Sequence, residues 1–208
     1  MAKRRTWLTT RDTPALLHMA DLAGTLGRSV HTVAQSPSSE GLARDAVDRD
    51  LADLDASASA SLMSFLTALR SAYVTPLPRE DLYLLASGIH HAVQRVVAAG
   101  ILVHHGHMDE LPADALDMLE TIGRQSELLT EATGQLRDLD ALEETWIQLT
   151  RASRRTDRVL VQWLASLGED LLQREFNRQR EVAWALQSAI EALRDVNTHL
   201  GAILVRES

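Results

Sequence analysis

The chain has no cysteine among its 208 residues, so disulfide bonds and thiolate chemistry are excluded. It also has no apolar run approaching the roughly 20 residues that a transmembrane helix needs. The basic beginning, MAKRRTWLTTR, is not followed by the apolar stretch of a secretory signal. We therefore expect a cytoplasmic protein, at most peripheral at the membrane, where these basic residues could contact anionic lipid.

Basic residues are in the minority, with 21 Lys and Arg against 29 Asp and Glu and a formal net charge of -8. Such a chain is repelled by phosphate backbones, which argues against binding to nucleic acid. The motifs H-E-x-x-H, G-x-S-x-G and the P-loop are missing as well, as are the E-x-x-H pairs of di-iron bundles. We expect a protein without catalytic activity.

Aromatic residues make up only 4% of the chain, whereas alanine and leucine abound. Both are strong helix formers, and small side chains let helices approach closely. Apolar residues recur at spacings of three and four over most of the chain, a pattern that predicts helices. We expect an all-α protein with six long helices, at about 13–35, 40–72, 79–103, 111–136, 139–167 and 170–205.

Breaks in the helical pattern divide the chain into two halves. The segment GHMDELP, which begins at Gly106, separates the third helix from the fourth. Short connections between long helices predict antiparallel neighbours in a bundle. We expect one domain over 1–208, built as two packed three-helix bundles, with pseudo-repeat halves at about 13–105 and 109–206.

The last helix carries the most regular apolar stripe. Its 4-3 repeat is of the coiled-coil type and needs an equally long partner face, which favours a homodimer. Trp184 lies off this stripe and hints at an interface, because aromatic side chains often anchor contacts. The stripe consists of Val182, Leu186, Ala189, Leu193, Val196, Leu200 and Ile203.

The stretch TPLPREDLYLLASGIHHAV at 75–93 joins a proline-rich linker to a helix with an acidic first turn. It resembles the central signature of the PhoU-like family, closest to the branch of Pit accessory or phosphate transport regulator proteins. The branch pattern is an aromatic-x-TP-x-x-RED linker followed by a helix of the LASALDDVLD kind. The residues that match it are Tyr73, Thr75, Pro76, Arg79, Glu80, Asp81, Leu85, Ala86 and Ser87.

This resemblance implies a non-catalytic, dimeric regulator of phosphate transport. Its implied partner is an inner-membrane phosphate permease, of the Pit type or related, or the sensor of that permease. Its implied mechanism is the docking of a helical face on that partner. Two other functions remain open from the sequence, namely a metal-binding helical bundle and a structural dimeric scaffold.

The resemblance also implies where metal ligands would lie. Family members that bind metal use E(D)-x-x-x-D patterns, because carboxylates four residues apart share one helix face and can hold a hard cation. In this chain only three of the corresponding positions carry an acidic residue, and the family's paired aspartates fall on His90 and His91. Imidazole suits zinc, nickel or iron better than magnesium. The candidate ligands are Asp55, His90, Gln94, Asp157 and Glu191, with Ser59, Ser153 and Gln187 at the remaining positions.

A second group of histidines lies near the end of the third helix. His104, His105 and His107 are close in sequence, and clustered imidazoles can bind transition metals. Cationic histidine is also favoured at a helix C-terminus, so the same residues have a purely structural interpretation. The sequence leaves both interpretations open.

Overall fold

A computed structural model describes residues 14–38, 42–154, 156–167 and 171–207. The basic N-terminal segment therefore lies outside the described residues. The described part is all-α, as the sequence predicts. Its elements are α1 (Pro14–Gln35), the short 3-10 helix η2 (Ser36–Ser38), α2 (Leu42–Ser71), α3 (Arg79–His105), α4 (Ala113–Gln135), α5 (Leu139–Ser153), α6 (Thr156–Ser166) and α7 (Gln173–Glu207).

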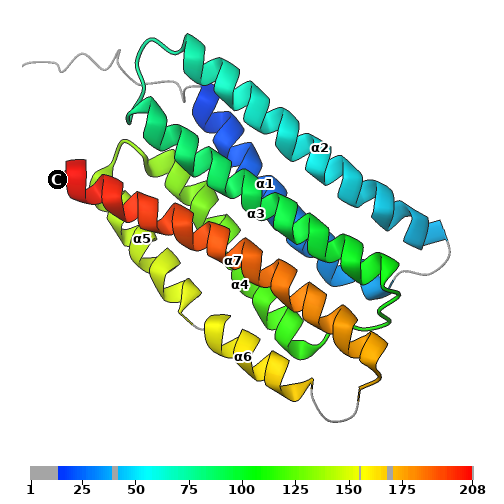
Figure 1. Ribbon diagram of the computed structural model, residues 1–208. Coiled ribbons are helices and arrows are strands. Elements are labelled where there is room, and N and C mark those ends of the chain that lie inside the picture. Colours follow the sequence, from blue (N-terminus) through cyan, green and yellow to red (C-terminus); the bar gives the residue numbers. More distant parts are fainter. Residues whose placement is uncertain (1–13, 39–41, 155, 168–170, 208) are drawn as a thin grey trace, which may run out of the picture.

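The helices form two groups that pack against each other (Figure 1). Helices α1, α2 and α3 pack on one another, and α4, α5, α6 and α7 make up the second group. The groups meet along two long contacts, α1 on α4 and α3 on α7. Because α5 and α6 follow one another in the place of a single helix, the arrangement confirms two packed three-helix bundles. Duplication of one ancestral unit stays a prediction.

The fifth predicted helix differs from the structure, since the segment 139–167 is broken between α5 and α6. At the break, the Ser153 hydroxyl donates to the carbonyl of Thr150, and the Thr156 hydroxyl donates to the carbonyl of Ser153. Arg154 N–H bonds only three residues back, to Arg151. Serine and threonine hydroxyls compete with the helical backbone in this way. The break has consequences for the candidate site below.

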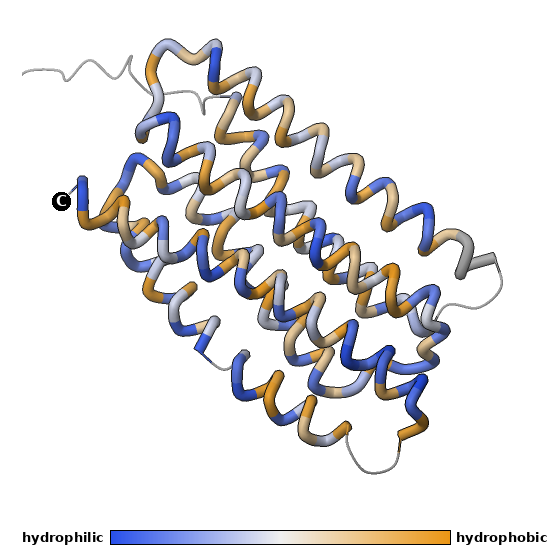
Figure 2. The backbone as a smooth tube through the Cα atoms, in the orientation of Figure 1, coloured by the Kyte–Doolittle hydropathy of each residue, from blue (hydrophilic) through white to orange (hydrophobic). Residues whose placement is uncertain are grey.

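The core is built from the apolar stripes that the sequence predicts. Figure 2 shows hydrophobic and hydrophilic residues alternating along the helices, and the stripes face inward. All seven residues of the 4-3 stripe in α7 are buried. Because α7 lies along α3, the long partner face of that stripe belongs to the same chain. The stripe therefore no longer argues for a second copy, and the homodimer stays a prediction.

Two glycines of α3 mark where the bundle is tightest. A Cβ atom added to Gly88 would collide with Cγ2 of Val196 in α7. One added to Gly100 would lie 2.7 Å from Val33 Cγ2 and 2.8 Å from Leu51 Cδ2. Helix α3 can therefore contact α1, α2 and α7 closely only because these positions lack a side chain. Among the described residues, none of the helices combines the length and the apolar character needed to span a bilayer.

Candidate functional site

The charged residues of the linker signature hold helix ends in place. The Arg79 guanidinium donates a 2.6 Å hydrogen bond to the carbonyl of Ala72, directly beyond the end of α2. Asp81, in the first turn of α3, is only 3% exposed. The two aromatic residues that flank the signature are exposed instead, Tyr73 by 99% and Tyr83 by 45%. In the signature, Asp81 is thus a buried charge, Arg79 is an exposed charge bonded to the backbone, and the two tyrosine rings are exposed.

Asp81 is held by the last turns of α7. Arg206 Nη2 donates to Asp81 Oδ1 over 2.6 Å. His199 Nε2 lies 3.0 Å from the same oxygen, although its geometry is not that of a hydrogen bond. A buried carboxylate requires such partners, because an isolated charge in the interior is costly. Asp81 therefore holds the start of α3 against the C-terminal end of α7.

His90 lies between α2 and α3, half-buried. Its Nε2 atom is 3.3 Å from the Ser59 hydroxyl, a distance at which either partner can donate a hydrogen bond. Burial lowers the pKa of His90 below its ordinary value, and neighbouring His91 lowers it further, while Asp55 acts in the opposite direction. Its surroundings therefore favour the neutral form of His90. Gln94, one turn further along α3, is exposed.

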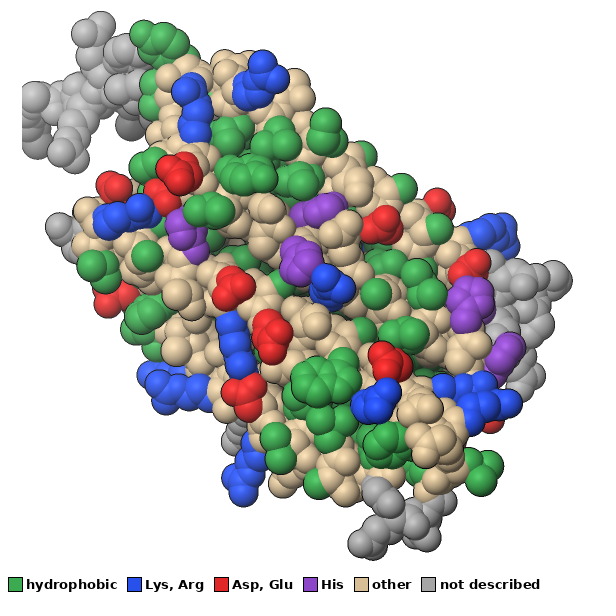
Figure 3. Space-filling model, viewed as in Figure 1, with side chains coloured by type: hydrophobic (Ala, Val, Ile, Leu, Met, Phe, Trp, Pro, Cys, Tyr) green, Lys and Arg blue, Asp and Glu red, His purple; other side chains and the backbone are tan. Residues whose placement is uncertain are grey.

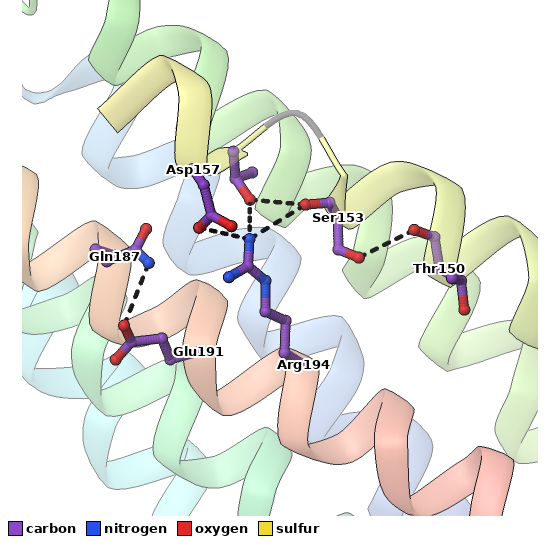
Figure 4. Close-up of polar contacts among 7 residues, drawn as sticks. Thr150, Ser153, Asp157, Gln187, Glu191 and Arg194 are labelled. Carbon is purple, nitrogen blue, oxygen red and sulfur yellow. Dashed lines mark hydrogen bonds and ion pairs between the residues drawn. The ribbon is translucent and has the colours of Figure 1, made fainter. Parts of the chain in front are cut away.

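The second set of predicted ligand positions lies between α6 and α7 and is shown in Figure 4. Here Arg194 of α7 reaches across to the break between α5 and α6. Its Nη2 atom is 2.8 Å from Asp157 Oδ1 and 2.8 Å from the Thr156 hydroxyl oxygen, and it also donates to the Ser153 carbonyl over 3.3 Å. A guanidinium group thus lies directly beside Asp157, one of the predicted metal ligands.

The remaining two positions of this set interact with each other. Gln187 Nε2 donates to Glu191 Oε1 over 3.2 Å, one turn apart on α7. Gln187 is buried, whereas Glu191 is exposed. Ser153 and Asp157 do not share one helix face, because the break separates α5 from α6.

These arrangements do not fit the multinuclear carboxylate centre that the fold family implies. The α2–α3 set, Asp55, Ser59 and His90, contains one carboxylate and a hydroxyl bound to imidazole. In the α6–α7 set, the carboxylate of Asp157 is already neutralised by Arg194. Hard cations such as Mg²⁺ require several free oxygen ligands. The predicted ligands are therefore split between two places, neither of which gathers such a set.

The histidines at the end of α3 are grouped with a carboxylate of α2 and not, as the sequence had suggested, with His107. His104 and His105 lie beside Asp48 of α2, and ligand atoms of these three residues all lie within 4.8 Å of one another. His107 is not in this group and is exposed, with a left-handed backbone (φ 53°). Asp48 could not be predicted from the sequence as a neighbour of His105, because the two residues are 57 positions apart.

An open surface groove of about 570 Å³ lies between α1 and α2. Its lining combines Arg28 and His31 of α1 with Asp50 and Asp53 of α2. Arg28 Nη2 donates to the Thr25 hydroxyl beside it. The groove is wide open to solvent, unlike the enclosed pockets that bind small molecules. No pattern in the sequence predicts this groove.

Comparisons with known proteins identify the fold of this chain. No family model matches the chain, and no curated protein matches it. Two solved structures from Shewanella oneidensis MR-1 are similar, and in each case the match covers 92% of this chain and 96% of the other, at 14% identity. One is described as a PhoU-like protein, with a TM-score of 0.66. The other is provisionally described as a PhoU-like phosphate regulatory protein, with a TM-score of 0.57. At this identity the likeness concerns architecture, and this chain has the PhoU-like helical fold.

Proposed function

We propose that this chain is a non-catalytic accessory protein that regulates phosphate transport by docking on a phosphate permease, of the Pit type or related. The observation that carries the proposal is the PhoU-like fold, matched along 92% of the chain by a structure described as a phosphate regulatory protein. The TPLPRED linker, with its resemblance to phosphate transport regulators, supports the same role.

A docking role is also supported by what the polar residues of the signature and of the predicted ligand positions do. Arg79, Asp81 and Arg194 each join one helix to another segment, through contacts of 2.6, 2.6 and 2.8 Å. Their charges are neutralised or hydrogen-bonded within the protein. Catalytic groups, in contrast, need a free face toward a substrate. These three residues therefore hold the helices of the bundle in place.

The surface best suited to docking is formed by the C-terminal half of α2, the linker and the first turns of α3. We call it the α2–α3 apolar face, and Figure 3 shows hydrophobic side chains gathered over this part of α2 and α3. Tyrosine and methionine are enriched at the centres of protein interfaces. Its members, with their exposed fractions, are Met63 (64%), Tyr73 (99%), Val74 (70%), Tyr83 (45%) and Leu84 (44%).

The charge of the chain matches the proposed partner. Cytoplasmic loops of membrane proteins carry an excess of Lys and Arg, and this chain has a net charge of -8. Opposite charges raise the rate at which the two proteins meet and fix their orientation. The apolar face would then supply the buried contact, since exposed apolar patches mark interaction sites.

The proposal is tested in a host from which the chain has been deleted, with phosphate uptake and co-purification with the host's phosphate permease as measurements. Restoring the wild-type chain is expected to change uptake and to recover the permease. The variant Tyr73→Ser/Tyr83→Ser is expected to do neither. The matched control Val161→Ser/Val205→Ser alters two exposed residues elsewhere, 64% and 80% exposed, and is expected to behave as wild type.

Two results would contradict the proposal. If deletion leaves phosphate uptake unchanged at both low and high external phosphate, the chain does not regulate transport, and a structural scaffold becomes the better interpretation. If uptake responds but the Tyr73→Ser/Tyr83→Ser variant works as well as wild type, the docking surface lies elsewhere. Circular dichroism of each variant shows whether the helical fold is retained.

A further inference from the structure

The beginning of α2 meets the end of α3 in a cluster of metal-binding side chains. Asp48 lies in the second turn of α2, and His104 and His105 lie in the last turn of α3. Ligand atoms of the three residues lie within 4.8 Å of one another. We propose that Asp48, His104 and His105 bind one transition metal ion of the zinc class.

The chemistry of the three side chains selects the metal. Two imidazoles and one carboxylate suit Zn²⁺, Ni²⁺ or Fe²⁺, whereas Mg²⁺ prefers oxygen ligands and retained water. Three protein ligands leave one position of a tetrahedral zinc ion open for water or another ligand. A zinc ion bound here would therefore have an open coordination position, in contrast to structural zinc sites, which have four protein ligands.

The distances are close to those of a bound ion. Zinc lies about 2.0–2.2 Å from nitrogen and oxygen ligands, so two ligand atoms of a tetrahedral ion are about 3.3 Å apart. His105 Nε2 and Asp48 Oδ1 are 3.2 Å apart. The whole group lies within 4.8 Å, so the remaining atoms are about 1.5 Å or less from that spacing.

Burial divides the three ligands into one fixed and two movable groups. His104 is only 9% exposed, so its ring is held by the packing of α3. The side chains of His105 and Asp48 are 64% and 53% exposed and are free to turn. The two histidine rings stand nearly at right angles, with centroids 5.0 Å apart. The site also lies at the C-terminal end of α3, where the helix dipole favours a cation.

His107 provides a matched control, because it is a neighbouring histidine outside the group. It adopts the left-handed backbone region with φ 53°. Asparagine tolerates this region better than most residues. The change His107→Asn therefore removes an imidazole near the site without adding backbone strain.

The test is a calorimetric titration of the full, untagged chain with Zn²⁺ in a buffer that does not coordinate metal. Wild type and His107→Asn are expected to bind one ion per chain, and Mg²⁺ is expected to give no heat. Asp48→Asn and His105→Ala are expected to weaken zinc binding by at least about 10-fold, because loss of even an outer-shell partner of a ligand costs 10–100-fold. Both variants change exposed side chains, so the fold is expected to remain.

A second measurement separates specific binding from surface association. Zinc stabilises only the folded state if it binds the assembled site, so it should raise the melting temperature of wild type and His107→Asn and not that of Asp48→Asn. No saturable zinc heat, or equal binding by wild type, Asp48→Asn and His105→Ala, would overturn the proposal. Weakening by His107→Asn as strong as that by His105→Ala would also overturn it. None of these outcomes depends on the proposed role in phosphate transport.

Discussion

Arg206 at the end of α7 donates a 2.6 Å hydrogen bond to Asp81, a carboxylate that is 3% exposed at the start of α3. The two residues are 125 positions apart, and their contact joins the two three-helix groups at one end. We expect Arg206→Met to lower the free energy of unfolding by about 2–3 kcal/mol, because it removes the guanidinium group that pairs with a buried carboxylate. Urea denaturation measures this loss.

The neutral variant Asp81→Asn is expected to cost less, about 1 kcal/mol, since it removes the buried charge together with its partner's bond. Glu80→Gln is the control, because Glu80 also lies in the first turn of α3 but is exposed. The decrease in the free energy of unfolding of Glu80→Gln reports only the interaction of this charge with the helix dipole, and it should stay below about 1 kcal/mol. If Arg206→Met costs no more than Glu80→Gln, the contact does not fasten α3 to α7.

Gly88 makes the approach of α3 to α7 possible, since a Cβ atom there would collide with Val196. We expect Gly88→Ala to destabilise the protein by about 1–3 kcal/mol, the usual range for an overpacked core. Gly24→Ala in α1 is the matched control. Its added Cβ would lie 3.6 Å from an atom of Arg28, an ordinary contact, so this change should stabilise by about 0.4–1 kcal/mol through the unfolded state. Thermal unfolding of both variants measures whether Gly88→Ala lowers the melting temperature and Gly24→Ala raises it.

The helices themselves could be predicted closely from the sequence, because apolar spacing and prolines are local signals. The stripe of α7 was identified residue by residue, and all of it is buried. The linker prolines separate α2 from α3 as expected. The stripe did not reveal its partner, which is α3 of the same chain, since periodicity shows that a helix has a buried face but does not show which helix covers it. The homodimer stays a prediction.

The contacts at the candidate sites could not be predicted, because they join residues far apart in sequence. Arg194 reaches Thr156 across 38 positions, and His105 reaches Asp48 across 57. The sequence pattern placed Ser153 and Asp157 on one helix, but the hydroxyls of Ser153 and Thr156 interrupt that helix. A spacing of four residues implies a shared face only when the helix is continuous.

Arg194 is expected to hold α6 against α7. The change Arg194→Met removes its contacts with Asp157, Thr156 and the Ser153 carbonyl. Because Asp157 is largely exposed, we expect a modest loss of about 1–2 kcal/mol, confined to α6. Hydrogen exchange of backbone amides should become faster in α6 and stay unchanged in α1.

Arg178→Met is the control for Arg194, because Arg178 forms an ion pair only one turn away on its own helix, with Glu175 at 3.9 Å. Its removal should leave exchange in α6 unchanged. Equal protection of α6 in wild type and Arg194→Met would show that packing around Trp163, rather than the guanidinium group, holds this helix.

His90 makes the stability of the protein depend on pH. Burial lowers the pKa of His90 below its ordinary value of 6.5, so the unfolded chain takes up a proton at this residue before the folded chain does. Stability therefore rises with pH wherever the unfolded state binds more protons. The contribution of neutral His90 is complete above about pH 6.5 and is lost progressively as the pH falls below that value.

The variant His90→Gln should flatten this dependence, because glutamine does not titrate yet can still hydrogen-bond to Ser59. Denaturant midpoints between pH 5 and pH 8 measure the slope, and His107→Asn, which changes an exposed histidine, should keep the wild-type slope. A wild-type slope retained in His90→Gln would assign the pH dependence to another group. A steeper rise of stability with pH in His90→Gln than in the wild type would mean that Asp55, which favours the charged form, outweighs burial at this position.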